Sequence, residues 1–146
     1  MKYAYLTAAC FFFASPALAS NSVHGLWLTE AGTGTVQIDD CGPGPMEGTP
    51  CGRVASADIP DGEPTTDVNN PDPSQHDQPS IGLIMLYGFE AKGESWKKGR
   101  IYDPESGKSY KSVIELDEDD PNVLKVKGCI AFLCQTQRWT RVVDGE

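Results

Sequence analysis

The stretch that most constrains the fold of this chain is residues 96–110, which read W-K-K-G-R-I-Y-D-P-E-S-G-K-S-Y. Two extended arms flank a short turn segment, and each arm carries an aromatic side chain, Tyr102 or Tyr110. Pro104 presets φ for the first corner of a type I turn, and Gly107 can supply the left-handed residue that closes a four-residue loop. The sequence therefore predicts a β-hairpin at this position.

Most of the remaining chain consists of short extended segments separated by turn residues, with no helical period longer than two turns. Beside the hairpin, whose second arm covers 109–116, strands are expected at 24–30, 35–39, 52–57, 81–89, 122–130 and 134–143. The apolar segment 81–89 is expected to be a strand buried on both faces, with a short buried helix as the alternative.

About eight strands joined mostly by hairpin-length turns predict an all-β fold, a single antiparallel up-and-down barrel. Closure of such a meander removes both exposed edges and leaves room for one small ligand. A β-sandwich is the structural alternative, although its cross-over connections would be longer than most of these.

Residues 1–19 have the pattern of a secretory signal peptide cleaved after Ala19. Lys2 supplies a positive charge, an apolar run covers 4–14, and a small-x-small site occupies 17–19. A lipoprotein cleavage box ending at Cys10 is the alternative, but the apolar residues that follow it argue against lipidation. The mature domain is then 20–146, located in the periplasm or secreted, with no transmembrane segment.

Four of the 5 cysteines remain in that domain, at positions 41, 51, 129 and 134. An even number in an exported chain favours disulfides, because oxidising compartments allow such thiols to pair. Of three possible connectivities we expect Cys41–Cys51 and Cys129–Cys134, since each closes a short loop between expected strands. The spacing does not fit the usual zinc knuckles.

The formal net charge is −9, and loss of Lys2 with the signal peptide removes one more positive charge. Such acidity argues against nucleic acid and anionic lipid as partners. No cofactor is indicated. The 2 histidines, the lack of a Ser in an elbow motif and the expected pairing of the cysteines also predict that the protein is not an enzyme.

A long acidic segment rich in Pro and Asn, residues 59–79, interrupts the strand pattern. Connections this long are usually functional or mobile. Four oxygen-bearing side chains lie close together in it and are candidate ligands of a hard cation such as calcium: Asp67, Asn69, Asn70 and Asp72. A rigid cluster of Asx turns is the favoured interpretation, because these residue types need no ion to explain them.

Several motifs in order along the chain resemble an exported bacterial family catalogued as domain of unknown function 2147. They are G-L-W-L-T-E at 25–30, C-G at 51–52, T-D-x-N-N-P-D-P at 66–73, the hairpin at 96–110, L-K-V-K-G-C at 124–129 and Q-R-W-T-R at 137–141. The resemblance implies a lipocalin-like barrel in the bacterial envelope and no established activity. The chain departs from the family at 75–78, where a basic residue is usual, and at the thin apolar segment 55–57.

Lipocalins begin with a G-x-W strand whose Trp closes the barrel floor beneath an Arg from a late strand. Trp27, with Arg138 or Arg141, resembles that arrangement, in which a guanidinium over an indole gains cation–π energy. Tyr102 and Tyr110 offer hydroxyls to orient a bound head group.

We therefore expect a small apolar or amphipathic ligand inside the barrel, which is lined or sealed by Trp27, Tyr102, Tyr110 and Arg138. The long segment 59–79 would act as a lid at the open end. The alternative function is an envelope module with a packed, ligand-free barrel that meets a protein partner.

Overall fold

The computed structural model describes residues 21–143, so the expected signal peptide lies outside the described residues. Nine strands and one short 3-10 helix form the fold: β1 (Gly25–Leu28), β2 (Gly34–Asp40), β3 (Pro50–Ala57), η1 (Pro73–Gln75), β4 (Ile84–Tyr87), β5 (Glu90–Lys92), β6 (Ser95–Asp103), β7 (Lys108–Leu116), β8 (Val123–Ile130) and β9 (Leu133–Arg141). No helix in this part of the chain is long and apolar enough to cross a membrane.

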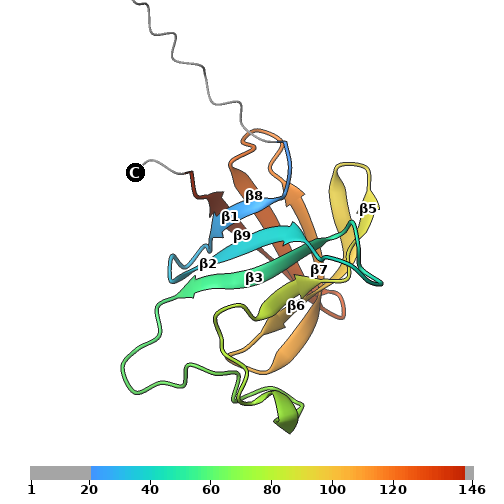
Figure 1. Ribbon diagram of the computed structural model, residues 1–146. Coiled ribbons are helices and arrows are strands. Elements are labelled where there is room, and N and C mark those ends of the chain that lie inside the picture. Colours follow the sequence, from blue (N-terminus) through green and yellow to red (C-terminus); the bar gives the residue numbers. More distant parts are fainter. Residues whose placement is uncertain (1–20, 144–146) are drawn as a thin grey trace, which may run out of the picture.

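The strands form one antiparallel sheet in the order β4-β3-β2-β1-β9-β8-β7-β6-β5, and pairing of β4 with β6 closes it into a barrel (Figure 1). Strands β4 and β5 lie end to end along β6, separated by Gly88 and Phe89, so the nine segments fill eight barrel positions. The predicted all-β barrel of about eight strands is confirmed.

Alternation along the strands places one face of each strand in the core. In β7 the buried residues are Ser112 and Ile114, and Tyr110 and Leu116 lie on the same face. In β8 they are Leu124 and Val126. The core cluster as a whole consists of Val23, Trp27, Val36, Ile38, Leu86, Phe89, Ile114, Leu124, Val126 and Trp139.

The hairpin predicted at 96–110 is present as β6 and β7. Asp103 pairs with Lys108, so residues 104–107 form the four-residue loop, and Gly107 has a φ of +66°. The backbone N–H of Gly107 donates to the carbonyl of Asp103 at 2.8 Å. Turn chemistry alone was sufficient to predict this element.

The prediction for residues 81–89 is wrong in extent. Only 84–87 form β4, because residues 80–83 form a turn in which Gly82 has a φ of +89°. Ile81 is therefore half-exposed instead of buried in a strand. Strand β5 was not expected, and the remaining strands begin and end within a few residues of their expected positions, the usual uncertainty of such boundaries.

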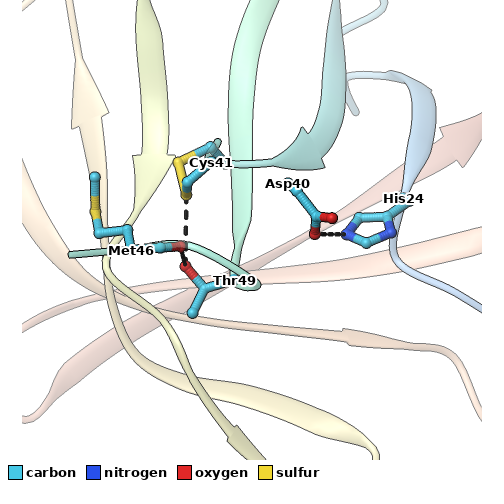
Figure 2. Close-up of a disulfide and its surroundings, with 6 residues drawn as sticks. His24, Asp40, Cys41, Met46 and Thr49 are labelled. Carbon is cyan, nitrogen blue, oxygen red and sulfur yellow. Dashed lines mark hydrogen bonds and ion pairs between the residues drawn. A yellow bond between two sulfur atoms is a disulfide. The ribbon is translucent and has the colours of Figure 1, made fainter. Parts of the chain in front are cut away.

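Both expected disulfides are present, Cys41–Cys51 and Cys129–Cys134. Figure 2 shows the first of them beside the loop that joins β2 to β3, where the Thr49 hydroxyl donates to the Met46 carbonyl at 2.7 Å. The same view shows His24 facing Asp40. Their Nε2 and Oδ1 atoms are 3.5 Å apart. These contacts hold the 41–49 loop and the entry to β1 at one end of the barrel.

The up-and-down order assigns each connection to one of two ends. The connections after β1, β3, β6 and β8 share one end, which we call the mouth, and those after β2, β5 and β7 share the other, which we call the floor. The long segment between β3 and β4 belongs to the mouth. In Figure 1 it is the green stretch that extends below the barrel, whereas the blue segment leading into β1 lies above.

Candidate functional site

A cavity of about 690 Å³ lies between the mouth of the barrel and the long segment. Its apolar part comes from inward-facing strand residues and from the segment itself: Val36, Val54, Met85, Ile59 and Val68. Val36 is buried in the core and pairs with Val54 across β2 and β3. The cavity therefore extends the barrel interior outward at the mouth, whereas core side chains fill the half of the barrel nearer the floor.

Polar groups surround this apolar part. Hydroxyl side chains are contributed by Thr29, Thr33, Thr35, Ser56, Thr66 and Ser80. Carboxylates are contributed by Asp58, Glu63, Asp103 and Glu105, whereas the described lining includes no Lys, Arg or His. The site thus has an apolar interior and a rim that is hydroxyl-rich and negatively charged.

A second, smaller hollow of about 300 Å³ lies on the outer wall beneath the same segment, between Asn70, Tyr87 and Tyr102. Its volume is at the lower limit for ligand pockets. The mouth cavity is more than twice as large and continues the barrel interior, so we take it as the candidate site.

The long segment is fixed to the barrel by a buried hydrogen-bonded group. Asp67 is only 1% exposed and accepts hydrogen bonds from the Tyr102 hydroxyl and the Asn70 amide, each at 2.7 Å. In the strand register Ile101 pairs with inward-facing Tyr110, so the adjacent Tyr102 faces outward and is covered by the segment. Tyr102 is therefore an anchor for the segment and does not line the barrel interior as expected.

A second attachment joins the segment to the hairpin loop. The Asn69 amide donates to the carbonyls of Pro104 and Glu105 at 3.2 and 3.0 Å. The Asn69 carbonyl also approaches Gly107 so closely that a Cβ at position 107 would collide with it. A glycine is thus required there by both its positive φ and the close approach of another backbone.

The remaining candidate cation ligands also have structural contacts. Asp72 caps η1 and accepts from the backbone N–H and the hydroxyl of Ser74, which lower its carboxyl pKa. Asn70 Oδ1 accepts from the Asp72 N–H at 2.9 Å. Asn70 and Asp72 thus form local turns of the expected kind, whereas Asp67 and Asn69 make long-range contacts with β6 and its hairpin loop.

The floor is sealed by a cation–π pair. The Arg141 guanidinium lies 4.1 Å from the ring centroid of Trp27, whose side chain is fully buried. Arg141 donates to the carbonyls of Ser22, His24 and Pro121 at 2.7, 2.8 and 3.2 Å. Burial lowers the pKa of its guanidinium, yet an arginine stays charged at any physiological pH.

Gly25 has its own role in this floor. Its φ is +133°, and a Cβ at this position would lie 2.7 Å from Arg141 Nη1. The G-x-W pattern therefore reflects packing, because the guanidinium that covers Trp27 passes directly over residue 25.

Arg138 lies elsewhere than expected. Residues 139 and 141 share the inward face of β9, so Arg138 faces outward, where it pairs with Asp117 at 2.8 Å and holds the pKa of that carboxyl below its usual value. Of the two arginines considered, Arg141 covers Trp27.

Tyr110 faces inward, is half-buried and pairs with Ile101.

The hydrogen bond between Tyr102 and Asp67 in the long segment should stabilise the fold in a pH-dependent way, which a Tyr102→Phe variant would reveal. Burial, and secondarily the hydrogen bond to Asp67, raises the pKa of Tyr102. In the unfolded chain the Tyr102 hydroxyl ionises near pH 10, whereas in the folded protein it stays protonated at that pH. The stabilisation is therefore complete below about pH 10 and is lost as the pH rises above it. We expect the variant to be less stable by about 1.5–3 kcal/mol at neutral pH.

Urea unfolding of the wild type and Tyr102→Phe over a series of pH values checks this prediction. The difference between their free energies of unfolding should shrink above about pH 10. A difference that stays constant through that range would contradict it.

A family model described as an uncharacterised protein conserved in bacteria, DUF2147, matches residues 25–141. The chain belongs to this family. Among solved structures, the protein HP1028 from Helicobacter pylori, whose title says that it belongs to the lipocalin family, superposes with a TM-score of 0.67 at 18% identity, covering 84% of each chain. No curated protein matches the sequence. The family and the lipocalin-like barrel expected from the motifs are thus confirmed.

Sequence reasoning did not identify most of the cavity lining. Val36 and Ile38 alternate with polar residues along β2, so they share one face, but which face points inward and which residues lie across the sheet depend on register. The choice of Arg141 was available from sequence, since it lies two residues from the apolar Trp139. No local signal distinguished buried Asp67 from the exposed acidic residues around it.

Proposed function

We propose that this member of the family is an exported binding protein, not an enzyme, that holds a small amphipathic molecule in the mouth cavity. The observation that carries the proposal is the cavity of about 690 Å³, within the range of small-molecule sites, with an apolar interior and a polar rim. The two disulfides support export to an oxidising compartment such as the periplasm.

The placement of the histidines favours binding over catalysis. His24 lies at the floor beside Asp40, and His76 lies in the long segment with its Nε2 2.8 Å from the Asn70 carbonyl. Neither lines the cavity. The alternative of a packed barrel that serves only protein contacts requires an interior without a sizeable cavity, and the mouth cavity weighs against it.

The rim narrows the class of ligand. Four carboxylates and no described cationic side chain create a negative potential at the entrance, which attracts cations and repels anions. The apolar part accommodates a hydrocarbon chain or ring. We therefore propose a ligand with an apolar body and a cationic or uncharged polar head, and we place fatty-acid carboxylates last.

Calorimetric titration with decyltrimethylammonium, decanol and decanoate tests this order of expected affinities. We expect saturable binding that is strongest for the cation and weakest for the carboxylate. A Val54→Phe variant, which narrows the apolar part, should weaken the binding of all three. Absence of saturable binding by any probe would reject the binding function, and preferential binding of decanoate would reject the charge preference.

Two neutralising variants test the rim itself. Asp58→Asn and Glu63→Gln should each raise the Kd of the cation by roughly two- to fivefold, as for an exposed charge pair, and leave that of decanol unchanged. Asp119→Asn, in the β7–β8 turn at the floor, is the matched control for net charge. An equal effect from the control would mean that the overall charge acts, and not the rim.

A further inference from the structure

The tip of the β8–β9 hairpin is an apolar surface that the binding function does not use. Ile130, Phe132 and Leu133 are 62%, 89% and 70% exposed, and the hairpin encloses them between Cys129 and Cys134. Every residue of this loop, C-I-A-F-L-C, is apolar or a disulfide cysteine. Exposed apolar side chains grouped in this way mark interaction sites.

The hairpin presents these side chains in a fixed arrangement. Cys129 and Ile130 pair with Cys134 and Leu133, leaving a two-residue loop of Ala131 and Phe132. Ala131 has a φ of +52°, a left-handed conformation that glycine adopts more easily, so the loop retains a side chain where the backbone favours glycine. The disulfide holds the base of the tip.

Basic side chains lie on the outer wall immediately behind the tip. Arg100, Lys111 and Cys129 occupy one row across β6, β7 and β8, and Lys127 lies two residues before Cys129. At about 4.8 Å per strand, Arg100 is roughly 10 Å from Cys129. All three basic side chains are exposed, and none forms an ion pair with another described residue.

We propose that this hairpin tip docks the protein on an anionic lipid surface. The apolar side chains enter the interfacial region, and the three basic residues face the lipid head groups, which is the combination that peripheral membrane anchors use. A protein partner fits less well, because a stable interface needs about 800 Å² on each side and this tip is a small, convex hairpin.

The net charge of −9 does not oppose this docking at physiological salt. The Debye length is then about 8 Å, so the charges at the floor are screened. Of the mouth carboxylates, Asp58 and Glu63 follow β3, which lies across the barrel from β8, whereas Asp103 and Glu105 lie at the end of β6, two strands from β8. The tip also lies at the mouth end of the barrel, since the β8–β9 connection is on the same side as the long segment.

Flotation of the exported, purified protein with vesicles tests the proposal. Its N-terminus is first determined by mass spectrometry, because the apolar run at 4–14, if retained, would bind vesicles by itself. We expect co-flotation with vesicles of equal parts phosphatidylcholine and phosphatidylglycerol, and weaker co-flotation with phosphatidylcholine alone. Phe132→Ser should lower partitioning about tenfold, the expected loss for one inserted aromatic side chain.

Val143→Ser is the matched control, since Val143 is 62% exposed but follows β9 at the floor. The double variant Lys111→Gln and Lys127→Gln should abolish the preference for the anionic vesicles. A Phe132→Trp variant should show a blue shift of its emission on vesicle binding, relative to the wild type.

Three results would overturn the proposal. One is absence of binding to either vesicle. Another is equal binding of the wild type and Phe132→Ser. The third is a Phe132→Ser effect on the oligomeric mass in place of vesicle binding, which would assign the tip to a second copy of the chain.

Discussion

Replacement of Trp27 by Ala is expected to lower the free energy of unfolding by about 3–5 kcal/mol. The indole is fully buried, its Nε1 donates to the Val23 carbonyl at 2.9 Å, and its ring lies beneath the Arg141 guanidinium. The substitution leaves a cavity in the floor. It also deprives the partly buried Arg141 guanidinium of its aromatic partner. Urea unfolding followed by circular dichroism measures the loss.

Leu28→Ala is the matched control for this prediction. Leu28 follows Trp27 on β1, faces outward and is 37% exposed, so we expect a loss below about 1 kcal/mol. Similar losses from both variants would show that the floor is not a centre of stability.

The second large effect is expected from Gly107→Ala, with a loss of about 2–3 kcal/mol. Part of it, about 1 kcal/mol, comes from the positive φ at residue 107, and the rest from the collision with the Asn69 carbonyl. The variant should therefore loosen the long segment specifically. Faster hydrogen exchange of the amide N–H groups of Asp67 and Asn70 would report this.

Gly93→Ala separates the two contributions. Gly93 has a similar φ, +62°, in the turn between β5 and β6, but a Cβ there would meet nothing within 4 Å. We expect only the φ cost of about 1 kcal/mol and unchanged exchange in the long segment. Equal losses from the two variants would mean that the contact between Asn69 and Gly107 contributes nothing.

These variants act on the two ends of one barrel. Trp27 and Arg141 close the floor, whereas Asp67, Tyr102, Asn69 and Gly107 fix the long segment at the mouth. The proposed ligand lies between those ends, and the proposed lipid contact lies beside the mouth. The hydrogen bond between Asp67 and Tyr102 lies on the outer wall, whereas Asn69 and the hairpin loop that it contacts also line the cavity.

The sequence by itself determined the elements whose causes are local. The hairpin at 96–110 follows from Pro104 and Gly107, which fix its turn, and the expected disulfides each close a loop of ten residues or fewer in sequence separation. The alternation along 109–116 grouped Tyr110, Ser112, Ile114 and Leu116 on one face of β7, and the structure turns that face inward. Such features depend on turn chemistry and on the period of two, both readable along one strand.

Only the tertiary structure decided which faces meet. A strand has two faces, and a shift of one residue in pairing exchanges them, so Tyr102 was expected inside although the register turns it outward beneath Asp67. For the same reason Arg138 was expected in the site with Arg141 as the alternative, whereas the structure places Arg141 over Trp27. The mouth cavity depends on barrel closure and on the path of a segment of 21 residues, 59–79, whose contacts with β6 span more than 30 positions in sequence.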